Sequence, residues 1–191
     1  MAEHTLILGG ARSGKSAWAE RQASAWAAEA PGREVVVIAT GEARDEEMRA
    51  RIAAHQAQRP AGWQTVEAPL ALTEALAAAD GPQRLLLVDC LTLWLTNLLL
   101  ADLPPELDLD SVRALQPGPR WHAGRAALLA VLPRLQAPVL LIGNEVGHGI
   151  VPLGAVNRLF VDESGRLHQA LAAQCARVRF VMAGCVLPLK G

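Results

Sequence analysis

The sequence predicts an α/β fold with a mostly parallel central sheet flanked by helices, and three observations predict it. A glycine-rich loop, Gly9–Ser16, lies between an apolar run of strand length, Thr5–Leu8, and a segment rich in helix formers. Further short apolar runs alternate with helical segments along the rest of the chain. One of these runs, Val35–Ile38, is apolar without interruption, which is typical of a parallel strand covered on both faces.

The glycine-rich loop matches the complete phosphate-loop motif G-x-x-x-x-G-K-[ST]. Its residues are Gly9, Gly10, Ala11, Arg12, Ser13, Gly14, Lys15 and Ser16. In such loops, backbone N–H groups and the N-terminus of the following helix face the phosphates of a nucleoside triphosphate. Lys15 is therefore expected to reach the β- and γ-phosphates, and the Ser16 hydroxyl is expected to bind Mg²⁺.

Composition narrows the class of protein. A chain of 191 residues is expected to form a single domain over 1–191. The net charge is −1 and the basic residues are dispersed, which argues against nucleic acid as a partner. The three cysteines, Cys90, Cys175 and Cys185, lack metal-ligand spacing and are interpreted as reduced packing residues.

No membrane span is expected. The most apolar stretch, Leu85–Leu103, is interrupted by Asp89, Thr92, Thr96 and Asn97, so it is better interpreted as a strand followed by a helix. The first residues, Met1–His4, have no basic region and lead directly into a strand, so no signal peptide is expected. Together with the reduced cysteines, this predicts a cytoplasmic protein.

After the phosphate loop, a helix is expected to continue to about Ala30, where Pro31-Gly32 stops it. The strand that follows, Glu34–Ala39, ends at Thr40-Gly41. Ligands of open parallel sheets bind at the carboxyl ends of the strands. Ala39, Thr40 and Gly41 are therefore candidates to line the nucleotide site, the alternative being an ordinary turn.

A charged, alanine-rich helix is expected over Glu42–Gln58, with Arg59-Pro60 beyond it. In helical geometry, Arg51 and Arg59 lie four residues on either side of His55. Neighbouring cations favour neutral imidazole, whose free nitrogen can attack phosphorus while arginines hold phosphate oxygens. Spacing alone leaves a second interpretation open, in which His55 is a solvated side chain.

The second strong chemical signal is Leu85–Asp89, an apolar strand that ends in an acid downstream of a phosphate loop. This is the Walker B pattern, in which Asp89 holds Mg²⁺. Before it, Trp63–Glu67 alternates as a short strand, and Pro69–Ala79 has the composition of a helix. After it, Cys90–Leu100 is expected to form an apolar helix.

The second half of the chain is expected to complete the sheet. Asn144 and Glu145 follow a buried strand directly and are candidate site residues, with His148 a weaker candidate. The expected elements are a loop over Ala101–Arg120, a helix over Trp121–Gln136, a strand over Pro138–Ile142, a glycine-shaped loop over Gly143–Pro152, a helix over Leu153–Cys175 and a closing strand over Val178–Ala183.

These motifs together resemble one family, the bifunctional adenosylcobinamide kinase and adenosylcobinamide-phosphate guanylyltransferase of cobalamin synthesis. The resemblance spans nearly the whole chain. The matching segments are Gly9–Ser16, Ile38–Thr40, Asp45–Met48, Arg51-Ile52 with His55, Arg59-Pro60 with Trp63, Thr96–Leu98, Asn144–Gly147 with Gly149–Pro152, and Gly165-Arg166 with Gln169. The chain departs from the family pattern at Val161-Asp162 and His168.

The resemblance implies two reactions and a RecA-like fold. In the first, the γ-phosphate of ATP or GTP passes to the aminopropanol hydroxyl of adenosylcobinamide. In the second, a histidine, here His55, attacks the α-phosphorus of GTP, expels pyrophosphate and carries GMP to the cobinamide phosphate. The resemblance also implies a trimer, and nucleotide contacts at the phosphate loop, Ala39, Thr40, Gly41, Gln56, Ala57, Gln58, Arg59, Glu67 and Asp89.

Two other functions remain open on sequence grounds. One is a phosphate-loop kinase of a small alcohol, in which His55 only binds phosphate. The other is a nucleotide-controlled switch or assembly ATPase that has no small-molecule acceptor. Covalently bound GMP would distinguish the bifunctional transferase from both.

Overall fold

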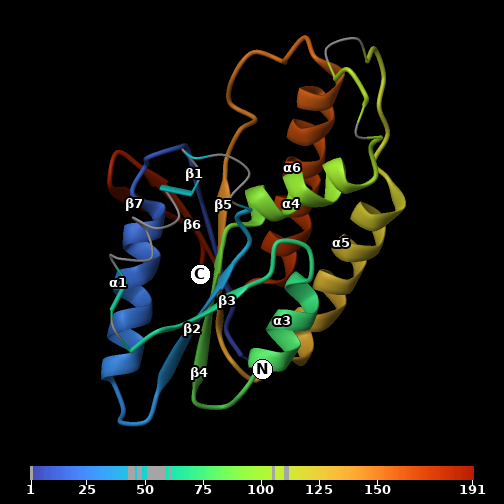
Figure 1. Ribbon diagram of the computed structural model, residues 1–191. Helices are drawn as coiled ribbons and strands as arrows, with labels where there is room; N and C mark the ends of the chain where they lie inside the picture. Colours follow the sequence, from blue (N-terminus) through green and yellow to red (C-terminus); the bar gives the residue numbers. More distant parts are fainter. Residues whose placement is uncertain are drawn as a thin grey trace.

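The computed structural model describes residues 2–42, 46, 49–50, 59–60, 62–104, 106–109 and 112–191 (Figure 1). Within these residues, strands and helices follow one another in the expected alternation. The elements in chain order are β1 (Thr5–Gly9), α1 (Lys15–Ala28), β2 (Glu34–Ala39), β3 (Gln64–Glu67), α3 (Leu72–Ala79), β4 (Arg84–Asp89), α4 (Leu91–Ala101), α5 (Pro119–Val131), the 3-10 turn η1 (Leu132–Arg134), β5 (Val139–Asn144), α6 (Ala155–Gln174), β6 (Arg177–Met182) and β7 (Cys185–Lys190).

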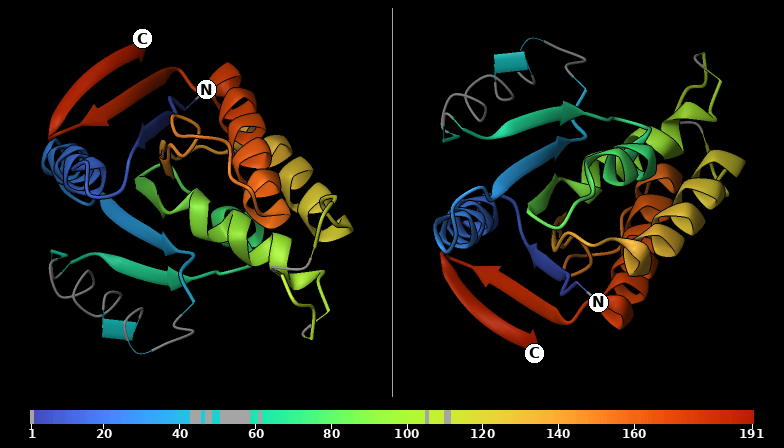
Figure 2. Two further views of the ribbon diagram at one scale, coloured as in Figure 1. Left: turned by 90° about the horizontal axis from the view of Figure 1, so that it is seen from above. Right: turned by 90° about the horizontal axis from the view of Figure 1, so that it is seen from below.

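The described strands form one sheet of seven, in the order β3-β2-β4-β5-β1-β6-β7. Every neighbouring pair is parallel except β6 and β7, which are antiparallel. The views along the sheet in Figure 2 show β3 near one edge and the β6–β7 hairpin near the other. The predicted mostly parallel sheet is confirmed.

One prediction about the sheet was wrong. Val178–Ala183 was expected to close the sheet, but Ala183-Gly184 forms a turn and β7 pairs back onto β6. The residues of β7 are half-buried or exposed, so they lack the continuous apolar pattern of the central strands. The positive φ of 78° at Gly184 supplies the backbone conformation that the tight turn needs.

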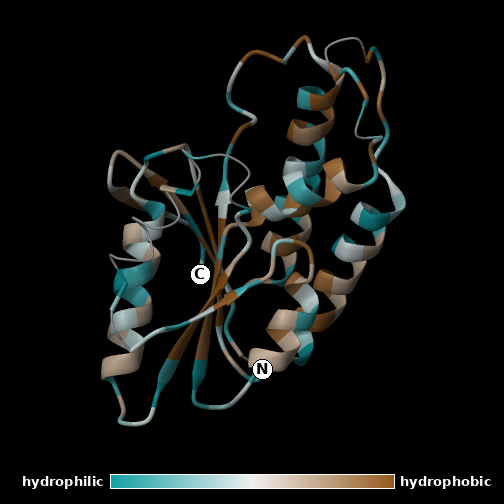
Figure 3. Ribbon diagram, viewed as in Figure 1, coloured by the Kyte–Doolittle hydropathy of each residue, from teal (hydrophilic) through white to brown (hydrophobic). Residues whose placement is uncertain are grey.

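Two hydrophobic cores, one on each face of the sheet, explain the uninterrupted apolar runs. Alternate residues of a strand point to opposite faces. Leu6 of β1 and Leu86 of β4 belong to one core, whereas Ile7 and Leu87 belong to the other. Because both faces are covered, the interior positions of the central strands are apolar, and polar residues such as Glu34 and Asp89 stand at their ends. The colouring of Figure 3 shows hydrophobic strands in the middle of the molecule, between helices in which hydrophilic and hydrophobic residues are mixed.

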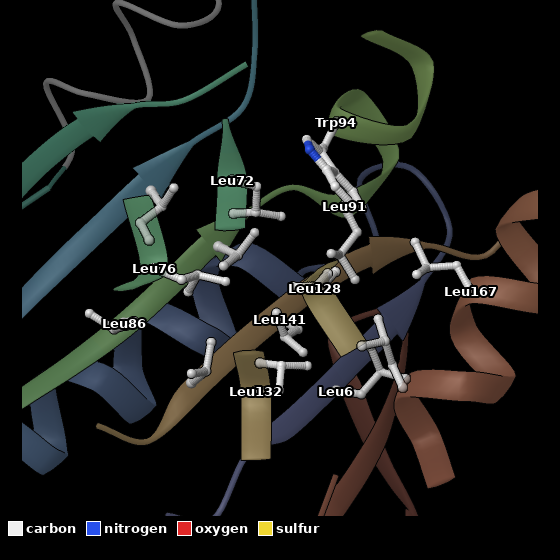
Figure 4. Packing of buried hydrophobic residues seen from close by; sticks show 14 of the residues in the cluster. Leu6, Leu72, Leu76, Leu86, Leu91, Trp94, Leu128, Leu132, Leu141 and Leu167 are labelled. Carbon is white, nitrogen blue, oxygen red and sulfur yellow. The ribbon is translucent and has the colours of Figure 1, made fainter. Parts of the chain in front are cut away.

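The two cores differ in size. Helix α1 covers one face, where Ala19 and Ala23 pack against the strands. Helices α3, α4, α5 and α6 gather on the other face (Figures 1 and 2). There, leucines from the strands and helices pack in one cluster with Trp94 (Figure 4). The rings of the completely buried Trp94 and Trp121 meet edge to face.

Several element boundaries shift from the predicted ones. Leu85–Leu103 is divided between β4 and α4, as expected, and no helix among the described residues has the length and apolarity that crossing a membrane requires. The helix predicted from Pro69 begins at Leu72, and the one predicted from Leu153 begins at Ala155. Most of the helix predicted over Glu42–Gln58 lies outside the described residues.

The three cysteines are free, as expected, but they do not all pack in the core. Cys90 and Cys175 are buried, whereas Cys185 is exposed at the start of β7. The prediction that Cys185 is a packing residue was therefore wrong, because the sequence did not reveal the edge strand that carries it.

Candidate active site

The carboxyl ends of the parallel strands bring most of the predicted site residues to one edge of the sheet. In the strand register, Ala39 of β2 lies between Glu67 of β3 and Asp89 of β4. Farther along the same edge, Asn144 of β5 is paired with Gly9 of β1. Sequence positions up to 135 residues apart, Gly9 and Asn144, thus become neighbours because the sheet order interleaves the two halves of the chain.

The phosphate loop leaves β1 through a close approach that only glycine permits. A Cβ at Gly9 would overlap the carbonyl oxygen of Val181 on β6 and would lie 2.7 Å from Ser13 Oγ. At the other end of the loop, Gly14 has a φ of 96° and forms the N-cap of α1. The two motif glycines are therefore required by the backbone, independently of any ligand.

Backbone hydrogen bonds hold the loop from both sides. Glu145, directly after β5, donates its N–H to Gly9 O at 3.0 Å, and Gly184, in the β6–β7 turn, donates to Ser13 O at 2.9 Å. We call Gly9–Lys15 with these two supports the backbone-built half of the site. The support from Gly184 was missed in the sequence, where Ala183-Gly184 was the only available signal for a turn.

Lys15 begins α1 and folds back over the loop. Its Nζ donates to Gly10 O at 2.9 Å, and the side chain is largely buried. Ser16 follows it in the first turn of the helix and is half-buried. The first N–H groups of α1 and the Lys15 ammonium thus lie at the same end of the helix, which is the arrangement that phosphate binding needs.

Side chains build the other half of the site, where β2 and β4 end. Thr40 is completely buried, and its hydroxyl donates to Cys90 O at 2.6 Å and accepts from Cys90 N at 2.9 Å. Asn97 of α4 donates to Thr40 O at 2.9 Å and to Pro69 O at 3.0 Å. These bonds fix the end of β2 against the start of α4, and they engage the Thr40 hydroxyl within the protein.

Asp89 lies at the end of β4 and contacts Arg59. The two side chains form an ion pair of 3.8 Å between Arg59 Nη2 and Asp89 Oδ2, with 7% and 19% of each side chain exposed. Arg59 also donates from Nη1 to Thr65 Oγ1 at 3.1 Å. We call Thr40, Asp89 and Arg59 the side-chain-built half of the site. Each was predicted separately as a site residue, but their association was not.

Glu145 and His168 form a second pair beside the phosphate loop. Glu145 Oε2 lies 3.7 Å from His168 Nδ1, and the His168 side chain on α6 is 7% exposed. Burial lowers the pKa of His168, while the neighbouring Glu145 carboxylate opposes that shift. The sequence indicated Glu145 as a candidate, but no pattern in the last helix singled out His168.

The remaining predicted residues fall into two groups. Gly41 is half-buried at the same edge, Glu67 is exposed, and Asn144 donates its N–H to Thr92 Oγ1 at 2.7 Å. His55, Gln56, Ala57 and Gln58 lie outside the described residues. The structure thus brings together the phosphate loop, Ala39, Thr40, Gly41, Glu67 and Asp89, with Arg59 on Asp89.

Comparison with protein families identifies this arrangement. The model of the family described as cobinamide kinase / cobinamide phosphate guanyltransferase matches residues 5–189. The chain belongs to this family. It is thus a transferase of cobalamin biosynthesis with a nucleotide-binding phosphate loop, and the match favours the bifunctional enzyme over a small-alcohol kinase or an assembly ATPase.

Curated relatives agree with this assignment over nearly their full lengths. The bifunctional adenosylcobalamin biosynthesis protein CobP of Pseudomonas aeruginosa is 52% identical over 97% of this chain and 96% of its own length. The bifunctional adenosylcobalamin biosynthesis protein CobU of Escherichia coli is 38% identical over 97% of this chain and 98% of its own length.

Solved structures support the fold. An ATPase of the type III secretion system of pathogenic bacteria superposes on 93% of this chain and 50% of its own, with a TM-score of 0.52 and 13% identity. At this identity the likeness concerns the fold alone, and it confirms the RecA-like phosphate-loop architecture.

Proposed function

We propose that this family member phosphorylates the aminopropanol hydroxyl of adenosylcobinamide with ATP or GTP and then transfers GMP from GTP to the product through a guanylyl-histidine. The observation that carries the proposal is the joining of two features at one edge of the sheet. The phosphate loop with Lys15 and the Walker B carboxylate Asp89 lie at the ends of β1 and β4, on either side of β5, and Asp89 contacts Arg59, four residues after His55 in the sequence.

In the phosphorylation step, the protein contributes position and charge. The N–H groups of the loop and of the first turn of α1 bind phosphate oxygens, and Lys15 leaves Gly10 O to contact the β- and γ-phosphates. Charge that develops on the transferring phosphoryl group is thereby stabilised at fixed donors.

Ser16 and Asp89 are a donor set that fits Mg²⁺. Magnesium prefers oxygen ligands and is commonly held by one or two carboxylates together with substrate phosphates and water. Ser16 and Asp89 would hold Mg²⁺, which would neutralise phosphate charge when bound, and the Asp89 carboxylate that now contacts Arg59 would then be a metal ligand.

In the guanylyl-transfer step, His55 is the nucleophile. Its free nitrogen bonds to the α-phosphorus of GTP as the bond to the pyrophosphate oxygen breaks, and pyrophosphate leaves with the electron pair. Arg59 assists this reaction, because its guanidinium can bind phosphate oxygens of GTP when Asp89 binds the metal instead of Arg59.

The nucleotide contacts are proposed at the phosphate loop and at Ala39, Gly41, Gln56, Ala57, Gln58, Arg59 and Glu67. Thr40 contributes indirectly, because its hydroxyl is bonded to Cys90 and it holds Ala39 and Gly41 in place. We propose that one triphosphate site serves both reactions.

We propose that the protein is cytoplasmic and forms a homo-oligomer, which family resemblance indicates to be a trimer. Exposed apolar side chains on the loop before α6 support association, because Ile150, Val151 and Leu153 are 98%, 71% and 97% exposed. Light scattering of the wild type and of I150S/L153S measures the state, and a monomeric wild type would contradict it.

GTP labelled at the α-phosphate tests the function directly. The purified protein is incubated with Mg²⁺ and labelled GTP, and label is sought on denatured protein that is stable in alkali and lost in acid, as a phosphoramidate requires. The control is His55→Ala, which is expected to bind GTP but carry no label. A wild type that binds GTP without becoming labelled would overturn the guanylyltransferase half.

A further inference from the structure

The carboxylate of Glu145 has no role in the functions assigned so far. Glu145 directly follows β5, and its backbone is bonded to the first residue of the phosphate loop. Glu145 follows a strand that runs between β4, which carries Asp89, and β1, which leads into the loop. Its N–H is bonded to Gly9 O at 3.0 Å, and its side chain is 22% exposed. Glu145 is therefore bonded to the start of the phosphate loop, where the triphosphate is proposed to bind, and its carboxylate is partly exposed to a substrate.

Two groups hold this carboxylate. Oε1 accepts from the N–H of Gly147 at 2.7 Å, and Oε2 faces His168 Nδ1 at 3.7 Å. His168 Nδ1 is buried and has no hydrogen-bond partner within the described part of the chain. The strand leaves room for the imidazole, since a Cβ at Gly143 would lie 2.7 Å from His168 Nε2. A neutral imidazole in this place can donate one N–H, and Glu145 is the acceptor that it faces.

Two other acids at this edge, Asp89 and Glu67, are less well placed for the acceptor alcohol. Asp89 already contacts Arg59 and belongs to the proposed metal site. Glu67 is on β3, at the far edge of the sheet from β1. Of these three acidic residues, only Glu145 has a backbone N–H that is bonded to the phosphate loop.

We propose that Glu145 is the general base of alcohol phosphorylation and that His168 is a positioning residue that orients it. The inference rests on the proposed function. The hydroxyl proton of the acceptor passes to the Glu145 carboxylate as the hydroxyl oxygen bonds to the γ-phosphorus. The bond from the γ-phosphorus to the β–γ bridging oxygen breaks, the nucleoside diphosphate leaves with the electron pair, and Glu145 then releases the proton to water. Guanylylation of His55 involves no acceptor alcohol, so it does not need Glu145.

The two half-reactions provide the test. Glu145→Gln keeps an oxygen that can accept from Gly147 N–H but removes the basic oxygen pair. We expect transfer of the γ-phosphate to cobinamide to fall by about 10²- to 10⁴-fold, while covalent labelling by α-labelled GTP stays within about twofold of wild type. Glu74→Gln, an exposed acid on α3, is the matched control and should change neither reaction.

Each outcome decides something. Phosphorylation by Glu145→Gln within about tenfold of wild type would overturn the assignment of the base. A parallel loss of phosphorylation and labelling, in a variant that unfolds at the wild-type temperature, would overturn it as well, because Glu145 would then act on the shared triphosphate site. A wild type that neither phosphorylates cobinamide nor becomes labelled rejects the proposed function instead.

The positioning role of His168 has its own signature. When asparagine replaces His168, its amide N–H lies near the former position of Nδ1, which faces Glu145. When glutamine replaces His168, its amide N–H lies near the former position of Nε2 instead. Loss of a donor to a carboxylate raises its pKa. His168→Gln should therefore move the acid limb of the phosphorylation kcat/KM profile to higher pH, and His168→Asn should restore it partly. An unmoved acid limb in a folded His168→Gln variant contradicts the role.

Discussion

The two halves of the candidate site are built in different ways. In the backbone-built half, the loop is held by main-chain hydrogen bonds from Glu145 and Gly184 and by a glycine packed against Val181 O. In the side-chain-built half, Thr40 is bonded by its hydroxyl, and Asp89 is held by an ion pair of 3.8 Å. The first half is fixed before any ligand binds, whereas the Asp89 contact can be exchanged.

This difference suits a site that runs two reactions. If one triphosphate site serves both reactions, as proposed, the same donors bind the triphosphate in each, and a rigid backbone frame serves both without rearrangement. In the proposed function, Asp89 and Arg59 change partners when the metal and the phosphates bind, and an ion pair between side chains can be exchanged in this way. Stability and activity should therefore respond differently to substitutions in the two halves.

The largest effect is expected in the backbone-built half. Gly9→Ala would drive a Cβ into Val181 O, so we expect a loss of about 3 kcal/mol in the free energy of unfolding together with loss of nucleotide binding. Gly10→Ala is the matched control, because a Cβ there meets nothing within 4 Å. Urea unfolding of both variants measures the difference. Equal free energies of unfolding for the two variants would contradict the rigidity of the backbone-built half, because the loop would then tolerate a shift at Gly9.

Removal of the Thr40 hydroxyl is expected to have the next largest effect. Thr40→Val keeps the shape but leaves the N–H of Cys90 unpaired in the interior, at a cost of about 2 kcal/mol, while Cys90 O keeps its bond from Trp94 N–H. Thr96→Val removes only a bond to Thr92 O within α4 and should cost under about 1 kcal/mol. If the two variants unfold alike, the Thr40 hydroxyl does not hold this half together.

The ion pair is expected to matter less for stability. Arg59→Gln should cost about 1 kcal/mol, while labelling by GTP falls more steeply, because the guanidinium is proposed to bind phosphate. Arg84→Gln removes an exposed pair with Glu34 of 3.2 Å and is the control for both measurements. An Arg59→Gln variant with undiminished labelling would show that the side-chain-built half can function without its arginine.

The smallest effect is expected from pH, and it arises from two buried histidines. Burial lowers the pKa of His4 and of His168 below 6.5 in the folded protein. The unfolded chain therefore binds protons first as pH falls, and the stabilisation that is present above about pH 6.5 is lost below it.

Unfolding measured at about pH 7 and about pH 5.5 checks this direction. His4→Gln should flatten the profile, because the His4 ring contacts Leu132 O and accepts from Val139 N only when it is neutral. A wild type that gains stability on acidification through this range would contradict the sign.

Parts of this architecture could be predicted from sequence because they depend on local chemistry. The glycines of the phosphate loop predict its conformation, and strands covered on both faces are recognised by their continuous apolar runs. The edge strand β7 was missed because its side chains are mostly exposed, so it lacks the apolar run that identified the others. Cys185 was misplaced for the same reason.

Other parts depend on the sheet order, which no local pattern specifies. Arg59 and Asp89 are each recognisable, but their contact depends on β2 and β4 being neighbours. His168 lies beside Glu145 only because α6 packs on the sheet next to β5, and a histidine in a long helix gives no sign of that. The role of His55 was inferred from resemblance, and it stays a prediction.

The central claim, that one triphosphate site serves both reactions, is tested most directly with Lys15→Ala. This variant removes a charge from the backbone-built half without altering His55 or the side-chain-built half. If the site is shared, phosphorylation of cobinamide and labelling by α-labelled GTP should both fall by at least about 10²-fold in a variant that unfolds like the wild type. Full labelling with phosphorylation abolished would contradict the claim and require a second triphosphate site.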